Sequence, residues 1–210
     1  MTSDRPGPPG EALNFGPTTE PRPAGTVILL RGGATTLEVL LVRRNPSARF
    51  MGGAWVFPGG SVNRGEGQGD RALRAAAIRE LEEEAAIAID DRDQLVPFSR
   101  WITPAEVKIR FDTWFYLATA PPDAVARADG SEVVDARWYG PAAALEARRR
   151  GELFLVFPTI KHLEQLSGFA SADELLAHAR GREIHPVQPR VVHQGETARI
   201  VLPGEPGYAD

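Results

Sequence analysis

Three glutamates near the middle of the chain are the residues best suited to chemistry. Glu80, Glu83 and Glu84 are spaced i, i+3 and i+4, and a helix turns by about 100° per residue, so their carboxylates share one face. Leu81 and Ala85 fall on the opposite side. Like charges this close repel one another, and a divalent cation would reverse that repulsion. Carboxylate oxygens suit Mg²⁺ or Mn²⁺, although a solvated acidic helix face has the same spacing.

A glycine pair upstream makes the metal interpretation more specific. The apolar segment 55–57 predicts a short strand that stops at a tight turn, Pro58-Gly59-Gly60. Glycines let backbone carbonyls or amides approach a metal or a phosphate closely, because no Cβ intervenes. The turn and the acidic helix together predict a site for a metal ion and a phosphate group.

The elements that position these residues alternate between strands and helices. The glutamates lie in a segment without glycine or proline, which predicts a helix from Asp70 to Ile87 with Asp70 as N-cap. The apolar runs 26–30 and 37–42 predict a hairpin. Further strands are expected at 95–102, 109–118 and 133–139, helices at 141–150, 158–167 and 172–180, and a last hairpin at 187–192 and 198–202. This order predicts a layered α/β fold.

The N-terminal region differs in composition from the rest. The first 25 residues hold six prolines and four glycines, which favours a flexible extension over residues 1–24. Residues 25–210 are expected to form a single domain, with a core at 25–145 and C-terminal helices and a hairpin at 146–205.

Composition excludes several classes of function. The 210 residues are 42% hydrophobic and 25% charged, as in globular proteins, and 24 basic against 28 acidic residues give a net charge of −4. No global positive field therefore attracts nucleic acid or an anionic membrane. The absence of cysteine excludes disulfides, thiolate zinc sites and cysteine nucleophiles. Without a long apolar run or a signal peptide, the sequence predicts a cytoplasmic protein.

The glycine and glutamate pattern resembles the box of the Nudix hydrolases, G-x5-E-x7-R-E-U-x-E-E-x-G-U, where U is a bulky aliphatic residue. Gly60 and Glu66 match its first two fixed positions, and the segment from Arg79 to Ile87 matches the rest except at Ala86. Twelve residues rather than seven separate Glu66 from Arg79, which leaves the role of Glu66 open. A positive φ at Ala86 would favour the family's glycine by about 1 kcal/mol.

The resemblance implies an α/β/α sandwich with a mixed sheet, and a metal-dependent enzyme that hydrolyses a diphosphate bond. By position, Glu83 and Glu84 would be metal ligands and Gly60 would supply a backbone carbonyl ligand. Glu80 would be a ligand or a base for the attacking water, and Arg79 would orient a box glutamate through a salt bridge.

A second resemblance, to the coenzyme A diphosphatase branch, overlaps the first. The segment Leu40–Gly60 is similar to the signature L-L-T-x-R-S-x3-R-x3-G-x3-F-P-G-G, with Val42 for threonine and Asn45 for serine. It implies that Arg44 and Arg49 recognise phosphates, since a guanidinium group suits phosphate oxygens. Arg44 could equally be the charged end of an edge strand.

These resemblances imply that the enzyme cleaves coenzyme A or acyl-coenzyme A into 3′,5′-ADP and (acyl-)4′-phosphopantetheine. Pro104, placed as in ADP-ribose-cleaving relatives, keeps ADP-ribose or another nucleoside diphosphate derivative open. A non-catalytic nucleotide sensor is also open, although such a protein would be expected to lose box carboxylates.

A small-molecule diphosphate is the expected partner, with no nucleic acid or membrane, and a homodimer is compatible with the sequence. Glu132, outside the box, could be a further ligand or base, or a solvent-facing loop residue. The tryptophans, including Trp101, could stack an adenine, but aromatic residues in strand-like segments are usually part of the core. The histidines, including His162, show no metal spacing.

Overall fold

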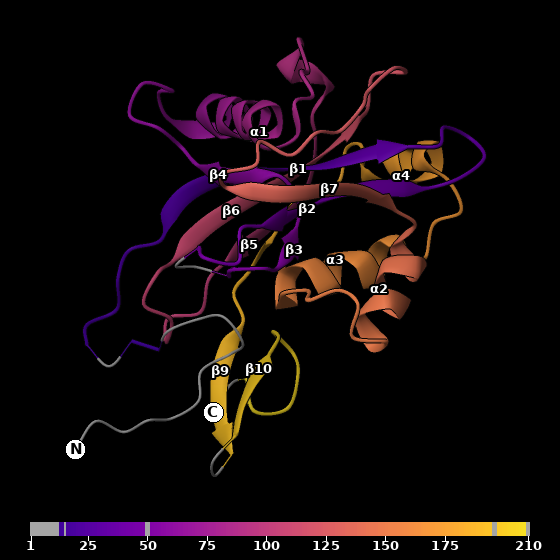
Figure 1. Cartoon of the computed structure of the whole chain (residues 1–210). Helices are drawn as coiled ribbons and strands as arrows, with labels where there is room; N and C mark the ends of the chain where they lie inside the picture. The colour runs from indigo at the N-terminus through magenta and orange to yellow at the C-terminus, as the bar shows by residue number, and fades with distance from the viewer. Residues whose placement is uncertain (1–12, 15, 49–50, 195–196, 209–210) are drawn as a thin grey trace.

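The computed structural model describes residues 13–14, 16–48, 51–194 and 197–208. Its centre is a mixed eight-stranded sheet (Figure 1) in which six strands follow the order β3-β2-β1-β6-β5-β8, while β4 pairs with β1 and β7 with β2. The strands of this sheet are β1 (Arg22–Arg31), β2 (Glu38–Arg44), β3 (Trp55–Val56), β4 (Gly59–Ser61), β5 (Val96–Ile102), β6 (Phe111–Thr119), β7 (Val133–Tyr139) and β8 (Pro186–Val187).

Helices cover both faces of the sheet. They are α1 (Gly69–Ala85), the 3₁₀ helix η1 (Arg92–Gln94), α2 (Pro141–Arg149), α3 (Phe157–Leu166) and α4 (Ala172–Ala179). Alternate side chains of β1 point to opposite faces: Val27 and Leu29 pack with Leu81 of α1, whereas Ile28 and Leu30 pack in the core that includes α2, α3 and α4. The predicted α/β/α sandwich is therefore confirmed.

The centre of the sheet combines a hairpin with a parallel pair. β1 and β2 are antiparallel, with Leu30 opposite Val39, as the two apolar runs predict. β1 is parallel to β6 from Arg22 to Leu30. β1 thus begins four residues before the predicted strand. Residues 1–12 of the predicted extension lie outside the described part of the chain.

Helix α1 differs from its prediction at both ends. Its N-cap is Gln68, whose side chain makes no capping hydrogen bond. Asp70 lies in the first turn instead and accepts a hydrogen bond from the Tyr116 hydroxyl at 2.9 Å, so its prediction as N-cap is wrong. The helix ends at Ala85, because Ala86 is left-handed with a φ of 55°. The condition under which glycine would be favoured at this position is therefore met.

The predicted turn at residues 58–60 is also corrected. Only Pro58 forms a bend, and Gly59 and Gly60 belong to β4, where Gly60 lies opposite Gly25 of β1. A Cβ on Gly25 would lie 2.0 Å from the carbonyl oxygen of Leu73. The glycine thus lets α1 approach β1 closely, which places the glutamate helix beside β4.

The strand predicted at 187–192 is divided into two shorter strands, β8 and β9 (Arg190–Gln194). β8 pairs with the edge strand β5, with Val187 opposite Trp101. β9 and β10 (Thr197–Val201) form a separate two-stranded sheet, which Figure 1 shows on the same side of the main sheet as α2 and α3.

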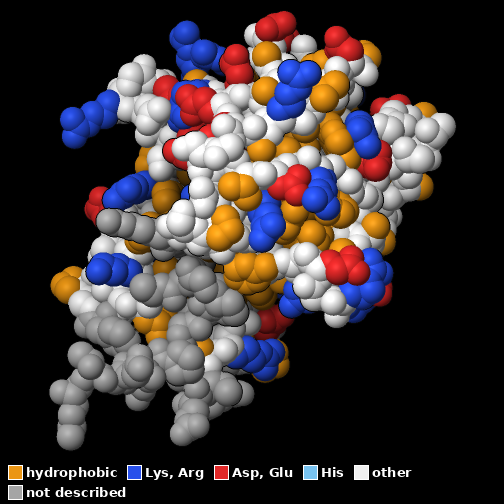
Figure 2. Space-filling model, in the orientation of Figure 1, with side chains coloured by type: hydrophobic (Ala, Val, Ile, Leu, Met, Phe, Trp, Pro, Cys, Tyr) orange, Lys and Arg blue, Asp and Glu red, His pale blue; other side chains and the backbone are white. Residues whose placement is uncertain are grey.

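The surface carries both signs of charge. Figure 2 shows basic and acidic side chains interspersed with apolar ones on the face that it presents. Within the described chain, no helix is both long enough and apolar enough to cross a membrane.

Candidate active site

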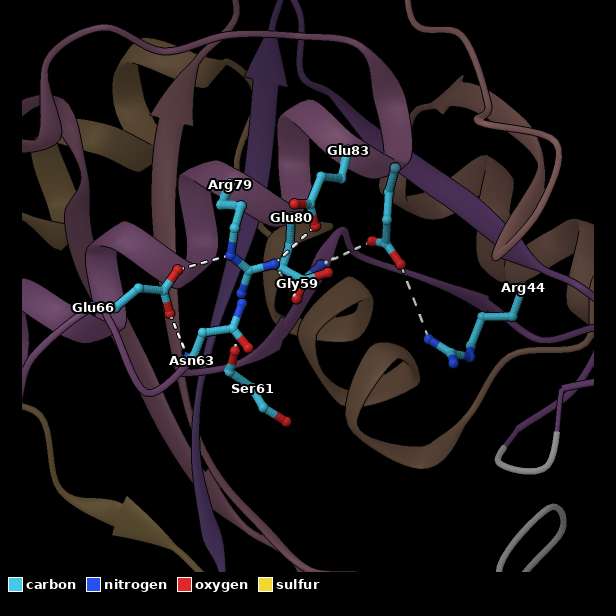
Figure 3. A network of polar contacts seen from close by, with 9 residues as sticks. Arg44, Gly59, Ser61, Asn63, Glu66, Arg79, Glu80 and Glu83 are labelled. Atoms are coloured by element: carbon cyan, nitrogen blue, oxygen red, sulfur yellow. Dashed lines mark hydrogen bonds and ion pairs between the residues drawn. The ribbon is translucent and has the colours of Figure 1, made fainter.

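Arg79 organises the carboxylates at the surface of α1. Its Nε donates to Glu66 at 2.7 Å, its Nη1 donates to Glu80 and Glu83 at 2.8 Å each, and its Nη2 donates to the Ser61 carbonyl at 3.0 Å. Figure 3 shows these carboxylates directed at one guanidinium group. A planar group with five N–H donors can hold several acceptors at fixed angles. Arg79 therefore forms ion pairs with Glu80 and Glu83, which are the contacts that a residue orienting a box glutamate would make.

Glu66 joins this network despite the long spacer. One carboxylate oxygen accepts from Arg79, and the other accepts from the backbone N–H of Asn63 at 2.6 Å. Helix α1 begins at Gly69, so ten of the twelve residues between Glu66 and Arg79 are helical, and Glu66 still reaches Arg79. In the structure Glu66 is thus a partner of Arg79.

Glu84 is the most deeply buried carboxylate of the box, with 2% of its surface exposed. Its Oε2 accepts from the Gly59 N–H at 3.0 Å, and its Oε1 lies 4.0 Å from Nη1 of Arg44. Burial raises the pKa of Glu84 to about 8, although the Gly59 hydrogen bond acts in the opposite direction and nearby Glu80 adds to the increase. A buried carboxylate with one distant guanidinium group is costly to ionise, and a cation beside it would remove that cost.

Glu80 lies against the backbone of Gly60. A Cβ on Gly60 would stand 2.2 Å from Oε1 of Glu80, so only glycine leaves room for this carboxylate. Burial raises the pKa of Glu80, and the Arg79 guanidinium group partly offsets the increase. The glycine turn and the acidic helix, which the sequence separates by twenty residues, are therefore in direct contact.

Glu83 takes a different direction from the other two. Its side chain is 58% exposed and bound to Arg79, and it does not line the cavity described below. In the described ranges, no three Asp, Glu or His side chains are grouped closely enough to hold a metal ion. The glutamates share a helix face as predicted, but they do not converge as a trio.

Glu132 reaches the same cavity from a loop. Asp129 fixes that loop by accepting backbone N–H groups from Ser131, Glu132 and Val133 at 3.2, 3.0 and 2.8 Å. The negative charge of Glu132 contributes to raising the pKa values of Glu80 and Glu84, which shows that it lies within their electrostatic range. The exposed loop residue is thus also a cavity residue.

These residues line one side of a cavity of about 360 Å³. We call this side the carboxylate wall; it consists of Arg44, Gly59, Gly60, Glu80, Glu84 and Glu132. Arg44 thus belongs to the cavity rather than only to a strand end. Arg49, the second predicted phosphate ligand, lies outside the described residues.

The other side of the cavity was not predicted. We call it the apolar wall; it consists of Trp101, Ile102, Pro104, Phe157, Pro189 and Ile200. Trp101 and Phe157 pack edge to face, with ring centroids 6.3 Å apart. Sequence reasoning favoured the core for the tryptophans and left stacking on an adenine open; the structure places Trp101 in the lining of the cavity.

His162 supports the apolar wall from behind. It is 1% exposed, and its ring lies 5.5 Å from that of Trp101 and 4.2 Å from that of Phe115. The Pro158 carbonyl can only accept, so Nδ1 donates to it at 2.7 Å and Nε2 accepts from the Ser99 hydroxyl at 2.6 Å. Burial lowers the pKa of His162 to about 4, so the ring is neutral near pH 7.

The donor set of the carboxylate wall fits a hard divalent cation. Glu84, which has only the distant Arg44 as a counter-charge, and Glu80, which is paired with Arg79, lie beside the backbone of Gly59 and Gly60. Mg²⁺ typically takes one or two protein carboxylates and completes its shell with water and substrate phosphates. A site that is incomplete without substrate therefore matches this type of ion.

Comparison with known proteins agrees with this geometry. The NUDIX domain family model matches residues 20–158, which is more than half of the chain. The chain belongs to the Nudix hydrolase family. Hydrolases of this family are pyrophosphohydrolases that generally depend on divalent metal ions.

Three relatives illustrate the range of similarity of this Nudix protein. "Putative nudix hydrolase 7" of Caenorhabditis elegans is 27% identical over 92% of this chain and 76% of its own length. "Acyl-coenzyme A diphosphatase NUDT19" of Homo sapiens is 28% identical over 54% of this chain and 32% of its own length. A crystal structure of a Nudix hydrolase from Alicyclobacillus acidocaldarius has a TM-score of 0.67 and 26% identity, covering 76% of this chain and 96% of that one.

Proposed function

We propose that this Nudix hydrolase cleaves the diphosphate bond of coenzyme A or acyl-coenzyme A, releasing 3′,5′-ADP and (acyl-)4′-phosphopantetheine. The observation that carries the proposal is that Arg44, from the coenzyme A diphosphatase signature, lines the same cavity as Glu80 and Glu84 of the Nudix box. The similarity to the human acyl-coenzyme A diphosphatase, which extends over about half of this chain, supports the same substrate class.

Mg²⁺ or Mn²⁺ would be held by Glu80, Glu84 and the Gly60 carbonyl. Glu83 would join them only by turning its side chain towards the cavity, which it does not line, and by releasing or sharing Arg79. A divalent ion at this place supplies neutralisation of the diphosphate charge and a more acidic bound water. Arg79 is a positioning residue that keeps Glu80 and Glu83 in place.

The remaining polar residues of the cavity act on the substrate directly. Arg44 donates to phosphate oxygens, for which a guanidinium group is well shaped. Glu132 accepts the proton of the attacking water, since its carboxylate is exposed within the cavity and is bound to no cation in the described contacts. On this assignment, Glu132→Gln lowers kcat while metal binding, measured by calorimetry, stays unchanged.

Product analysis by mass spectrometry tests the proposed function. The protein is incubated separately with coenzyme A and with ADP-ribose, each in Mg²⁺, in Mn²⁺ and in chelator. We expect 3′,5′-ADP and 4′-phosphopantetheine from coenzyme A only when metal is present. Cleavage of ADP-ribose alone would contradict coenzyme A as the substrate. Cleavage of neither compound would contradict both the first and the second candidate function.

Hydrolysis of ADP-ribose is the second candidate, and Pro104 favours it because this residue does line the cavity. A nucleotide sensor without catalytic activity is the third. Retention of Glu80, Glu83 and Glu84 argues against it, because a sensor does not need three repelling carboxylates on one helix face.

A further inference from the structure

The two walls of the cavity differ in charge. Four charged side chains are among its described lining residues, namely Arg44, Glu80, Glu84 and Glu132, and all four belong to the carboxylate wall. Thr103 also lines the cavity, between Ile102 and Pro104 of the apolar wall. Its hydroxyl accepts a hydrogen bond from the Phe111 N–H at 3.0 Å. Thr113, opposite Trp101, and Thr159 also line the cavity, so a group bound against the apolar wall meets mainly hydrocarbon and aromatic rings and few polar partners.

Residues beyond the matched Nudix domain complete the apolar wall. Pairing of β8 with β5 places Val187 opposite Trp101, so the chain reaches the cavity edge just before Pro189. The backbone N–H of Val191 then lies 3.4 Å from the Glu106 carboxylate. Val191 pairs with Ile200 in the β9–β10 hairpin. The chain is thus held to the rest of the domain before Pro189, at Val187, and after it, at Val191. Through the pairing with Val191, Ile200 lies in the lining of the cavity.

We infer that this C-terminal segment determines the class of substrate, by selecting a diphosphate whose second phosphate carries an uncharged, hydrocarbon-rich chain rather than a sugar. The inference rests on the proposed function and adds to it the residues Pro189 and Ile200 as specificity determinants. A ribose placed against this wall turns closely spaced hydroxyl groups towards a surface with few partners for them, which is costly. A pantetheine chain can place its gem-dimethyl and methylene groups on the wall, which is favourable, and keep its two amides and its hydroxyl in water.

Two substrates that differ only in this group provide the test. Dephospho-coenzyme A and ADP-ribose both contain ADP, and the second phosphate carries a pantetheine chain in one and a ribose in the other. The quantity measured is the ratio of their kcat/KM values. The variant is Ile200→Thr, which keeps a β-branched side chain on the strand, and Arg199→Gln is the control because Arg199 is exposed on the same strand.

We expect the wild-type protein to favour dephospho-coenzyme A. Ile200→Thr should lower the ratio about tenfold, which is the size of effect that small changes in an apolar pocket produce, and Arg199→Gln should leave it unchanged. Pro189→Ser should act in the same direction as Ile200→Thr, and a thermal unfolding curve checks that each variant is folded.

Two results would overturn the inference while leaving the proposed function in place. The first is an unchanged ratio in both cavity variants, and the second is a wild-type ratio that favours ADP-ribose while coenzyme A is still cleaved. If no coenzyme A derivative is cleaved, the proposed function fails instead. Calorimetric dissociation constants for the same two compounds then decide the inference, because equal affinities in wild type and Ile200→Thr would contradict it.

Discussion

The carboxylate wall and the apolar wall are built in different ways. Most of the carboxylate wall comes from two segments, β4 and α1. Hydrogen bonds hold it: Arg79 binds Glu80, and the Gly59 N–H binds Glu84. The apolar wall comes from β5, α3 and the C-terminal segment, and packing and strand pairing hold it. The first wall contains charge that suits a diphosphate and its metal, and the second contains the surface that can distinguish one diphosphate from another.

Removing a charge from the carboxylate wall should give the largest effect. Glu84→Gln keeps an oxygen that accepts the Gly59 N–H but removes a negative charge beside the phosphates. We expect kcat to fall by about 100-fold or more, as when other preorganised charge-stabilising groups are lost. Steady-state kinetics in saturating Mg²⁺ measure this fall.

Glu82→Gln is the matched control, because Glu82 is exposed on the same helix and does not line the cavity. Its kcat should equal that of the wild-type protein. Full activity of Glu84→Gln with an intact fold would contradict the assignment of Glu84 as a metal ligand.

His162, which supports the apolar wall, makes the free energy of unfolding depend on pH. The pKa of His162 is about 4 in the folded protein and about 6.5 when unfolded. The unfolded chain therefore binds a proton at a higher pH, and stability is lost as the pH falls from 6.5 towards 4. The difference amounts to about 3 kcal/mol of unfolding free energy.

Denaturant unfolding at several pH values gives the free energy of unfolding of the wild-type protein and of His162→Gln. The contribution of His162 is the difference between the two slopes of this free energy against pH. His185→Gln is the control, because the His185 side chain is 77% exposed and its variant should show the wild-type slope. Identical slopes for wild type and His162→Gln would mean that the buried ring does not link protonation to unfolding.

Arg79 tests whether the carboxylate wall needs its orientation as well as its charge. Lysine keeps the positive charge but cannot bind Glu66, Glu80 and Glu83 through a planar fork. We expect Arg79→Lys to lower kcat/KM by about 10- to 100-fold, as is typical of residues that orient metal ligands. The activity should also require more Mg²⁺, because Glu80 is less well placed.

Arg71→Lys gives the comparison for a conservative change at an exposed position of the same helix. It should leave both kcat/KM and the Mg²⁺ requirement unchanged. If Arg79→Lys behaves in the same way, the network around Arg79 stabilises the helix without positioning the reacting groups.

Sequence patterns predicted the glutamates that α1 contributes to the carboxylate wall, because that information is local. The spacing of Glu80, Glu83 and Glu84 fixes their common helix face, whereas Arg44 and Glu132 of the same wall come from segments distant in the sequence. The N-cap prediction for Asp70 failed because the helix begins one residue earlier, at Gly69, and the Asp70 carboxylate binds Arg74 and Tyr116 of β6 instead of a backbone N–H. The contact between Glu66 and Arg79 could not be predicted, because the number of residues between them does not determine the path of the chain.

The apolar wall and its support could not be predicted, because they depend on contacts between distant residues. Ser99 and His162 are hydrogen-bonded across 63 positions of the chain. Likewise, Ile200 reaches Trp101's side of the cavity only after β8 has joined the edge of the sheet. No periodicity links these segments, so apolar residues in them could only be predicted as core.

The end of helix α1 allows a small but sharp test of how firmly the carboxylate wall is placed. Ala86 is left-handed, with a φ of 55°, and its N–H bonds to the Glu82 carbonyl at 2.9 Å. Glycine adopts this conformation without a Cβ penalty, so Ala86→Gly should raise the free energy of unfolding by about 0.5–1 kcal/mol. Activity should stay the same, because Glu84 lies two residues inside the helix. A loss of stability would mean that the greater freedom of glycine in the unfolded chain outweighs the relief of strain, and a loss of activity would mean that the cap controls the carboxylates as well as the helix end.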